Sequence, residues 1–182
     1  MLRLKIIKRP TKPGYIVGID EAGRGPVIGP MVIAGVASQK EKIQKLDSIG
    51  VRDSKVLSPT KRSELFDRII EISEGVAVIY LSPQTMDSWV RRRKLNVLEA
   101  KAMACIANFF NEASLYIIDA PSSIKRFRDY MDRFISIPST KILLEPKADI
   151  KYTVVASASI IAKVLRDAEI DKIKRITGID FG

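Results

Sequence analysis

The chain has 182 residues, 46% of them hydrophobic and 29% charged, a composition typical of one soluble globular domain. It contains no histidine and a single cysteine, which excludes histidine-activated nucleophiles, imidazole-bound zinc and an intramolecular disulfide. No apolar run approaches the roughly 20 residues of a membrane span, and the N-terminus lacks a signal-peptide pattern, so we expect a cytoplasmic protein without membrane contact. The net charge of +10 favours a polyanionic partner such as nucleic acid, although a general solubility bias explains it equally well.

Residues 1–14 form a basic extension that we expect to contain at most a short strand. Ser58-Pro59 and Ser82-Pro83 each place a capping serine before a proline, which is the start signal of a helix. The stretch 95–111 is apolar on most faces and is predicted to be a buried helix. Apolar runs of strand length, rich in Val, Ile and Tyr as in strands covered on both faces, occupy 15–19, 31–36, 76–81, 115–118 and 141–144.

The last predicted helix, 154–168, begins with the small residues Ala156 to Ser159, which allow close packing on a sheet. The first two strands are joined by a short connection rich in glycine and proline, which indicates an antiparallel pair. Helices separate the later strands and suggest parallel crossovers. We therefore predict an α/β fold in which a mixed sheet of five strands carries helices on both faces.

Four carboxylates stand out by their position in these elements. Asp20 and Glu21 close the first predicted strand, Asp119 closes the fourth, and Asp149 comes just before the final helix. Carboxylates that lie close together repel one another unless a divalent cation neutralises them, and oxygen ligands select Mg²⁺ or Mn²⁺. Two such ions are a common means of phosphodiester hydrolysis, so we expect the four side chains to converge within about 8 Å. A turn or helix-capping role for each aspartate is an equally good explanation from position alone.

The segment between the first two strands has a composition suited to close contact with a phosphate or sugar. Gly23 and Gly25 allow the backbone to approach a ligand, and Arg24 supplies a cation. The segment leads into a strand and lacks the Gly-Lys-Ser/Thr of a nucleotide phosphate loop. A plain tight hairpin is the alternative interpretation.

The string Asp20-Glu21-Ala22-Gly23-Arg24-Gly25-Pro26, followed by Gly29-Pro30, resembles the signature of type 2 ribonuclease H (ribonuclease HII), particularly its archaeal branch. The resemblance covers about residues 15 to 182. Further blocks similar to those of the family follow in the same order, at Asp53-Ser54-Lys55, Ile118-Asp119-Ala120-Pro121, Lys147-Ala148-Asp149 and 156–163.

This resemblance implies an RNase H-like catalytic domain over 15–182, and Asp20, Glu21, Asp119 and Asp149 as ligands of two Mg²⁺ or Mn²⁺ ions. It implies an endonuclease that hydrolyses the RNA strand of RNA–DNA hybrids and nicks 5′ of ribonucleotides embedded in duplex DNA, leaving 3′-hydroxyl and 5′-phosphate ends. The partners would be RNA–DNA hybrid duplexes and DNA duplexes containing ribonucleotides, and we expect the protein to be a monomer.

The resemblance also implies contacts to the nucleic acid. Gly23, Arg24 and Gly25 would read the 2′-hydroxyl of the ribonucleotide, the group that separates RNA from DNA locally. Lys55, Asn96, Ser157 and Lys163 are further candidate contacts. Ser157 is equally well explained as a small packing residue, and Lys163 as a solvated helix lysine. For Lys55, the contact with the nucleic acid is favoured over a solvated loop lysine. The run 91–94 is a candidate for tracking the duplex backbone, with a solvated surface as the alternative.

The resemblance has one departure. Chains of this family continue beyond the last predicted helix into a segment that contains glycine and tyrosine and then into further helices, whereas this sequence stops at Gly182. We therefore expect metal binding with weakened recognition of the ribonucleotide. A weakened or inactive hybrid-binding fragment is the alternative to an active nuclease. A small-nucleotide phosphate-binding protein is disfavoured, because the sequence has no phosphate loop.

Overall fold

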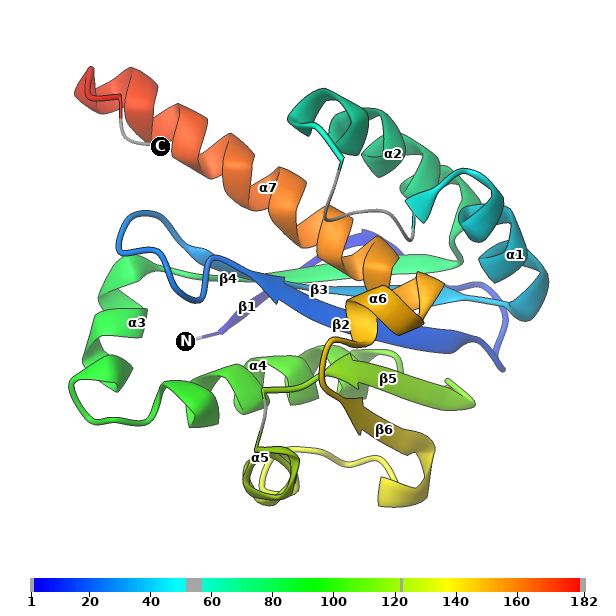
Figure 1. The fold of residues 1–182 in the computed structure, drawn as a ribbon. Helices are drawn as coiled ribbons and strands as arrows, with labels where there is room; N and C mark the ends of the chain where they lie inside the picture. The colour runs from blue at the N-terminus through cyan, green and yellow to red at the C-terminus, as the bar shows by residue number, and fades with distance from the viewer. Residues whose placement is uncertain (1, 52–56, 122, 181–182) are drawn as a thin grey trace.

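A computed structural model describes residues 2–51, 57–121 and 123–180 of the chain, and Lys55 lies outside these ranges. A six-stranded mixed sheet forms the centre of the fold, with helices on both faces (Figure 1). The strands are β1 (Arg3–Lys8), β2 (Ile16–Ala22), β3 (Met31–Ser38), β4 (Gly75–Leu81), β5 (Leu115–Asp119) and β6 (Ile142–Glu145). The helices are α1 (Lys40–Ser48), α2 (Pro59–Ile72), α3 (Pro83–Val90), α4 (Leu95–Phe109), α5 (Ile124–Met131), α6 (Ala148–Lys151) and α7 (Thr153–Thr177).

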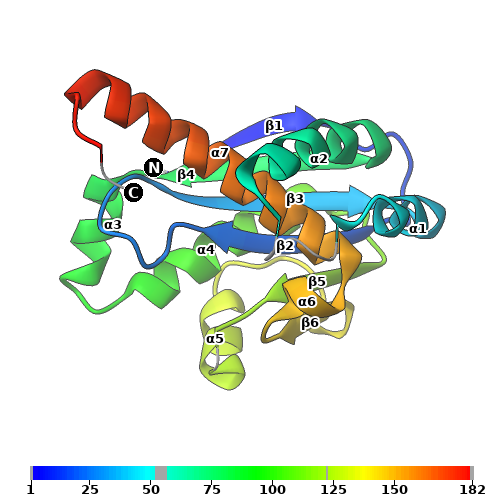
Figure 2. The same ribbon diagram turned by 45° about the horizontal axis from the view of Figure 1, so that its top comes forward.

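The α/β class and the five strands expected from the apolar runs are confirmed, and the sheet has one strand more. That strand, β1, lies in the basic extension and pairs antiparallel with β4 at the edge of the sheet (Figure 2). Exposed Arg3 and Lys5 alternate there with partly buried Leu4 and Ile6. Such alternation is typical of a strand with one covered face, and it is too short to distinguish a strand from a basic tail in the sequence alone. The domain boundary at residue 14 stays a prediction.

The strand order is β1-β4-β3-β2-β5-β6. The pair β2/β3 is antiparallel, and β5 and β6 extend the sheet in parallel from β2, as the sequence predicts. The crossover from β3 to β4 differs from the expectation, because these two strands are antiparallel although helices separate them. The connection contains two helices, α1 and α2, and returns the chain to the end of the sheet that it left, so that Ala37 pairs with Gly75.

The sheet separates two hydrophobic cores. Helices α1, α2 and α7 pack on one face, and α4 and α5 cover the other (Figures 1 and 2). The capping serines act as predicted, since Ser58 Oγ accepts a hydrogen bond from Lys61 N and Ser82 Oγ accepts one from Thr85 N. None of the helices in the described ranges is long and apolar enough to cross a membrane.

The first turns of α7 lie directly against β2. Val154 of α7 and Gly18 of β2 come so close that a Cβ atom on Gly18 would lie 2.3 Å from the Val154 carbonyl carbon. The small residues at the start of α7, Ala156 and Ser157 among them, are fully buried there. This close approach holds α6, the short helix just before α7, beside the end of β2.

Candidate active site

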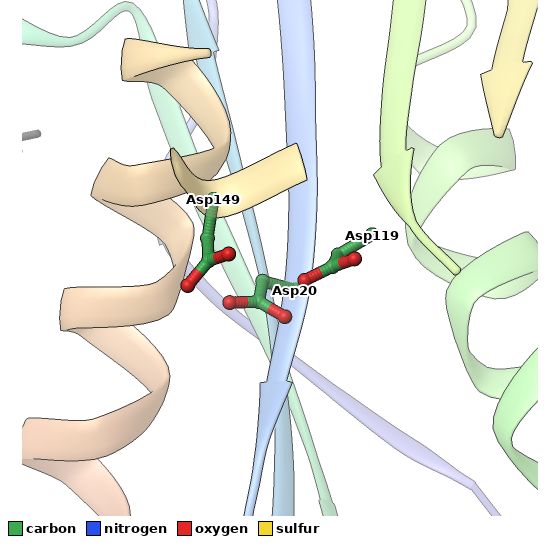
Figure 3. Close-up of side chains that lie close together, drawn as sticks. All are labelled: Asp20, Asp119 and Asp149. Carbon is green, nitrogen blue, oxygen red and sulfur yellow. The ribbon is translucent and has the colours of Figure 1, made fainter. Parts of the chain in front are cut away.

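Three aspartates from separate elements meet where the carboxyl ends of two neighbouring strands lie. Asp20 lies near the end of β2, Asp119 is the last residue of β5, and Asp149 lies in α6. One carboxylate oxygen from each lies within 4.8 Å of the others (Figure 3). Because β2 and β5 are parallel neighbours, their carboxyl ends lie side by side, and α6 brings the third carboxylate to them.

Backbone hydrogen bonds fix two of these carboxylates in place. Asp20 Oδ1 accepts a hydrogen bond of 2.8 Å from the backbone N–H of Glu21. Asp119 Oδ1 accepts one of 3.3 Å from the N–H of Ala148, which joins the end of β5 to the start of α6. The geometry of the aspartate cluster therefore depends on the backbone of three elements and less on side-chain freedom.

Glu21, the fourth carboxylate that the sequence singles out, lies beside the aspartate cluster and does not belong to the group of oxygens within 4.8 Å. It lines a pocket of about 250 Å³ together with Asp119. The other residues around this pocket are Arg24, Glu99, Ala120, Pro121, Pro146 and Lys147. Glu21, Glu99 and Asp119 thus border a cavity large enough for a phosphate group and the ions beside it.

The carboxylates lie in an environment that disfavours their charge. Burial raises the pKa of Asp20 well above its ordinary value, and the negative charges of Glu21 and Asp119 raise it further. Burial also raises the pKa of Glu21 to about 7, with added repulsion from Glu99 and Asp119. A divalent cation bound among these groups would offset this repulsion, which supports a cation site.

Glu99 is a site residue that was not predicted from the sequence. Its side chain is 1% exposed, and it accepts a hydrogen bond of 2.9 Å from Arg24 Nε in an ion pair. The Arg24 guanidinium also donates a hydrogen bond of 2.7 Å to Asn96 Oδ1. Helix α4 therefore holds Arg24 with two side chains one turn apart. The signal in the sequence was a single acidic residue in a stretch predicted to be a buried helix.

The two glycines beside Arg24 differ in what the fold requires of them. Gly23 has φ +88°, and a Cβ atom there would lie 2.5 Å from the Pro30 carbonyl oxygen, so the protein itself demands glycine. At Gly25, a Cβ atom would meet no atom within 4 Å. The protein therefore leaves open space at Gly25, and its chain neighbour Arg24 lines the carboxylate-lined pocket.

The chain is similar to known proteins over almost its whole length. The model of the ribonuclease HII family matches residues 17–182. The ribonuclease HII of Pyrococcus furiosus is 43% identical over 169 residues, which cover 92% of this chain and 74% of the relative. The chain belongs to the ribonuclease HII family. This family consists of metal-dependent endoribonucleases, and the predicted resemblance is confirmed.

Solved structures of ribonucleases H have the same fold. The ribonuclease HII in a PCNA:RNase HII complex from Archaeoglobus fulgidus matches with a TM-score of 0.82 and 37% identity, covering 92% of this chain and 80% of that one. A Bst-RNase HIII in complex with Mn²⁺ matches with a TM-score of 0.81 and 25% identity, covering 92% of this chain and 56% of that one. The RNase H-like fold predicted from the sequence is thus confirmed.

The donors at the site fit the divalent cation that ribonuclease HII enzymes need. The aspartate cluster offers only carboxylate oxygens, the donor type that Mg²⁺ and Mn²⁺ prefer, and two of its members, Asp20 and Asp149, are buried. Asp20, Asp119 and Asp149 would hold the cation, and Glu21 lies next to them on the pocket side.

The remaining predicted contacts to nucleic acid differ in their surroundings. Ser157 is fully buried, and its hydroxyl donates a hydrogen bond of 2.8 Å to Thr153 O, which favours the packing role. Lys163 is half-buried on α7, and the basic run 91–94 is exposed in the turn before α4. Nucleic-acid contacts by Lys163, by this run and by Lys55, which falls outside the described ranges, stay predictions.

Proposed function

We propose that this chain is an endonuclease that hydrolyses the RNA strand of RNA–DNA hybrids and nicks duplex DNA 5′ of embedded ribonucleotides. The products would carry 3′-hydroxyl and 5′-phosphate ends, and two Mg²⁺ or Mn²⁺ ions would take part. We further propose that the protein acts as a monomer.

One observation carries this proposal: the oxygens of Asp20, Asp119 and Asp149 lie within 4.8 Å of one another, and Asp119 also lines the adjoining pocket. Their role would be to hold the cations, and Glu21 would complete the ligand set from the adjacent side. Bound divalent ions supply an activated water molecule and neutralise the charge that develops on the leaving oxygen. Backbone hydrogen bonds to Asp20 and Asp119 hold these ligands ready.

Recognition of the ribonucleotide would belong to Gly23, Arg24 and Gly25. The hydrogen bonds from Arg24 to Glu99 and Asn96 anchor this loop on α4, so the loop has a fixed position. The open space at Gly25 would admit a ribose close to the backbone, where a 2′-hydroxyl can both donate and accept hydrogen bonds.

A nicking assay tests the proposed function. The substrates are a DNA duplex with one ribonucleotide, a long RNA–DNA hybrid and an all-DNA duplex of the same sequence, each with Mn²⁺ or Mg²⁺. We expect cuts in the first two and none in the third. Binding of the ribonucleotide duplex without any nick would contradict the proposal and support the hybrid-binding alternative.

Gly25→Ala is expected to leave the melting temperature unchanged, since the added methyl group meets no protein atom. It should reduce cleavage at a single ribonucleotide about 10- to 100-fold, because the methyl group would occupy the space left for the ribose and break a hydrogen bond to it. Melting curves and initial rates check the two parts. Gly23→Ala is the matched control and should lower the melting temperature. Normal cleavage by folded Gly25→Ala would count against the proposed role of the loop.

A further inference from the structure

Lys147 adopts a backbone conformation that side chains rarely take. Its φ is +56°, and Arg93 is the other residue besides glycine with positive φ in the part of the chain that the structure describes. Glycine adopts this conformation with little strain, whereas a residue with a Cβ atom is strained there. The turn before α6 therefore carries a lysine at a position that suits glycine, and its side chain calls for an explanation.

The side chain lies at the candidate active site. Lys147 is exposed and lines the same pocket as Glu21 and Asp119. The next residue, Ala148, donates its N–H to Asp119, and Asp149 follows directly. Lys147 therefore directly precedes, in the chain, the residue that bonds Asp119 and the residue that supplies the third carboxylate of the aspartate cluster.

Lys147 is the basic residue of this pocket that has no partner within the described ranges. Arg24, which also lines the pocket, is held by Glu99 and Asn96. Lys151, four residues further on, pairs with Glu145. Within residues 2–51, 57–121 and 123–180, no carboxylate lies within ion-pair distance of Lys147.

We propose that Lys147 binds a non-bridging oxygen of the nucleic-acid phosphate that enters the pocket. The inference rests on the proposed function, which brings a phosphodiester to the carboxylates. A phosphate that approaches Glu21, Glu99 and Asp119 is repelled, and the ammonium group of Lys147 offsets part of this repulsion from the rim of the pocket. A lysine serves as a mobile point charge for a phosphate, which fits an exposed position at the pocket rim.

The test compares Lys147→Ala, Lys147→Arg and Lys147→Gly with the unchanged chain on a duplex that contains one ribonucleotide. In EDTA, where no cleavage occurs, Lys147→Ala should bind the duplex about tenfold more weakly. The slope of log Kd against log salt should fall by about one, because one phosphate contact is lost. Lys147→Arg should retain most of the binding. Lys125→Ala removes an exposed lysine of α5, outside the pocket, and is the charge control.

Lys147→Gly separates a binding role from a structural one. It should raise the melting temperature by about 2 °C, because glycine relieves the strain, and still lose as much duplex binding and cleavage rate as Lys147→Ala. Arg93→Gly is the control for strain relief and should raise the melting temperature similarly.

Unchanged binding, salt slope and cleavage in Lys147→Ala would overturn the inference and leave the proposed function intact. Normal duplex binding by Lys147→Gly, with only the melting temperature altered, would likewise show that Lys147 has only a structural role in the turn. If the unchanged chain failed to cut, the proposed function would fail, and the binding measurements in EDTA would still decide the role of Lys147.

Discussion

Asp119→Asn is expected to reduce cleavage by at least about a thousandfold while the protein folds normally. The substitution removes a ligand charge from the aspartate cluster and keeps the shape of the side chain. The loss of metal-assisted stabilisation corresponds to several kcal/mol, and each 1.36 kcal/mol is a factor of ten in rate. The amide oxygen of asparagine can still accept the hydrogen bond from Ala148 N, so the junction between β5 and α6 should persist.

Rates on the ribonucleotide duplex with Mn²⁺ and melting curves of both proteins check this expectation. Asp129→Asn, which changes an exposed aspartate of α5, is the matched control and should cut at the normal rate. The same variant pair should differ in Mn²⁺ affinity, with weaker binding by Asp119→Asn alone. A nearly normal rate for Asp119→Asn would show that Asp119 does not contribute to the reaction.

The affinity for Mn²⁺ is expected to fall about tenfold for each pH unit between pH 7 and 5. The pKa of Glu21 is raised from 4.5 to about 7, chiefly by burial, so below pH 7 this carboxyl is protonated and must lose its proton when a cation binds. The raised pKa of Asp20 adds to the effect in the same direction. Titration calorimetry at several pH values measures the slope, and an affinity independent of pH over this range would contradict the expectation.

The metal-free protein should show the opposite trend in stability. The folded state holds the Glu21 proton more tightly than the unfolded chain, so this contribution is present below about pH 4.5 and is lost as the pH rises through about 7. Added Mn²⁺ should therefore raise the melting temperature more at pH 8 than at pH 5. Glu21→Gln, which cannot ionise, should flatten both dependences.

Much of the architecture is determined by local sequence patterns. Apolar runs mark five strands, and serine–proline pairs mark the starts of α2 and α3, because caps and side-chain periodicity act over a few residues. The carboxylates at the strand ends could be predicted because local patterns mark where the strands end. Asp20 lies near the end of β2 and Asp119 ends β5, and the parallel pairing of these two strands brings their carboxylates together. The sequence predicted parallel crossovers, whereas the order of the strands came from the structure.

Contacts between distant segments determined the features of the fold and the site that the sequence did not predict. The β1 strand depends on an edge that β4 offers, and the antiparallel β3/β4 pair depends on the path of α1 and α2, neither of which a local pattern encodes. The bond between Arg24 and Glu99 joins residues 75 positions apart.

Lys147 is a single residue whose conformation and surroundings the local sequence does not predict. Its sequence neighbours mark a motif of the family. They do not predict that its backbone is left-handed or that it lines the pocket. The sequence by itself determined the family, most of the secondary structure and the acidic residues of the site. The tertiary structure alone decided which side chains are buried, paired or left facing the pocket, because those properties depend on contacts between segments distant in the chain.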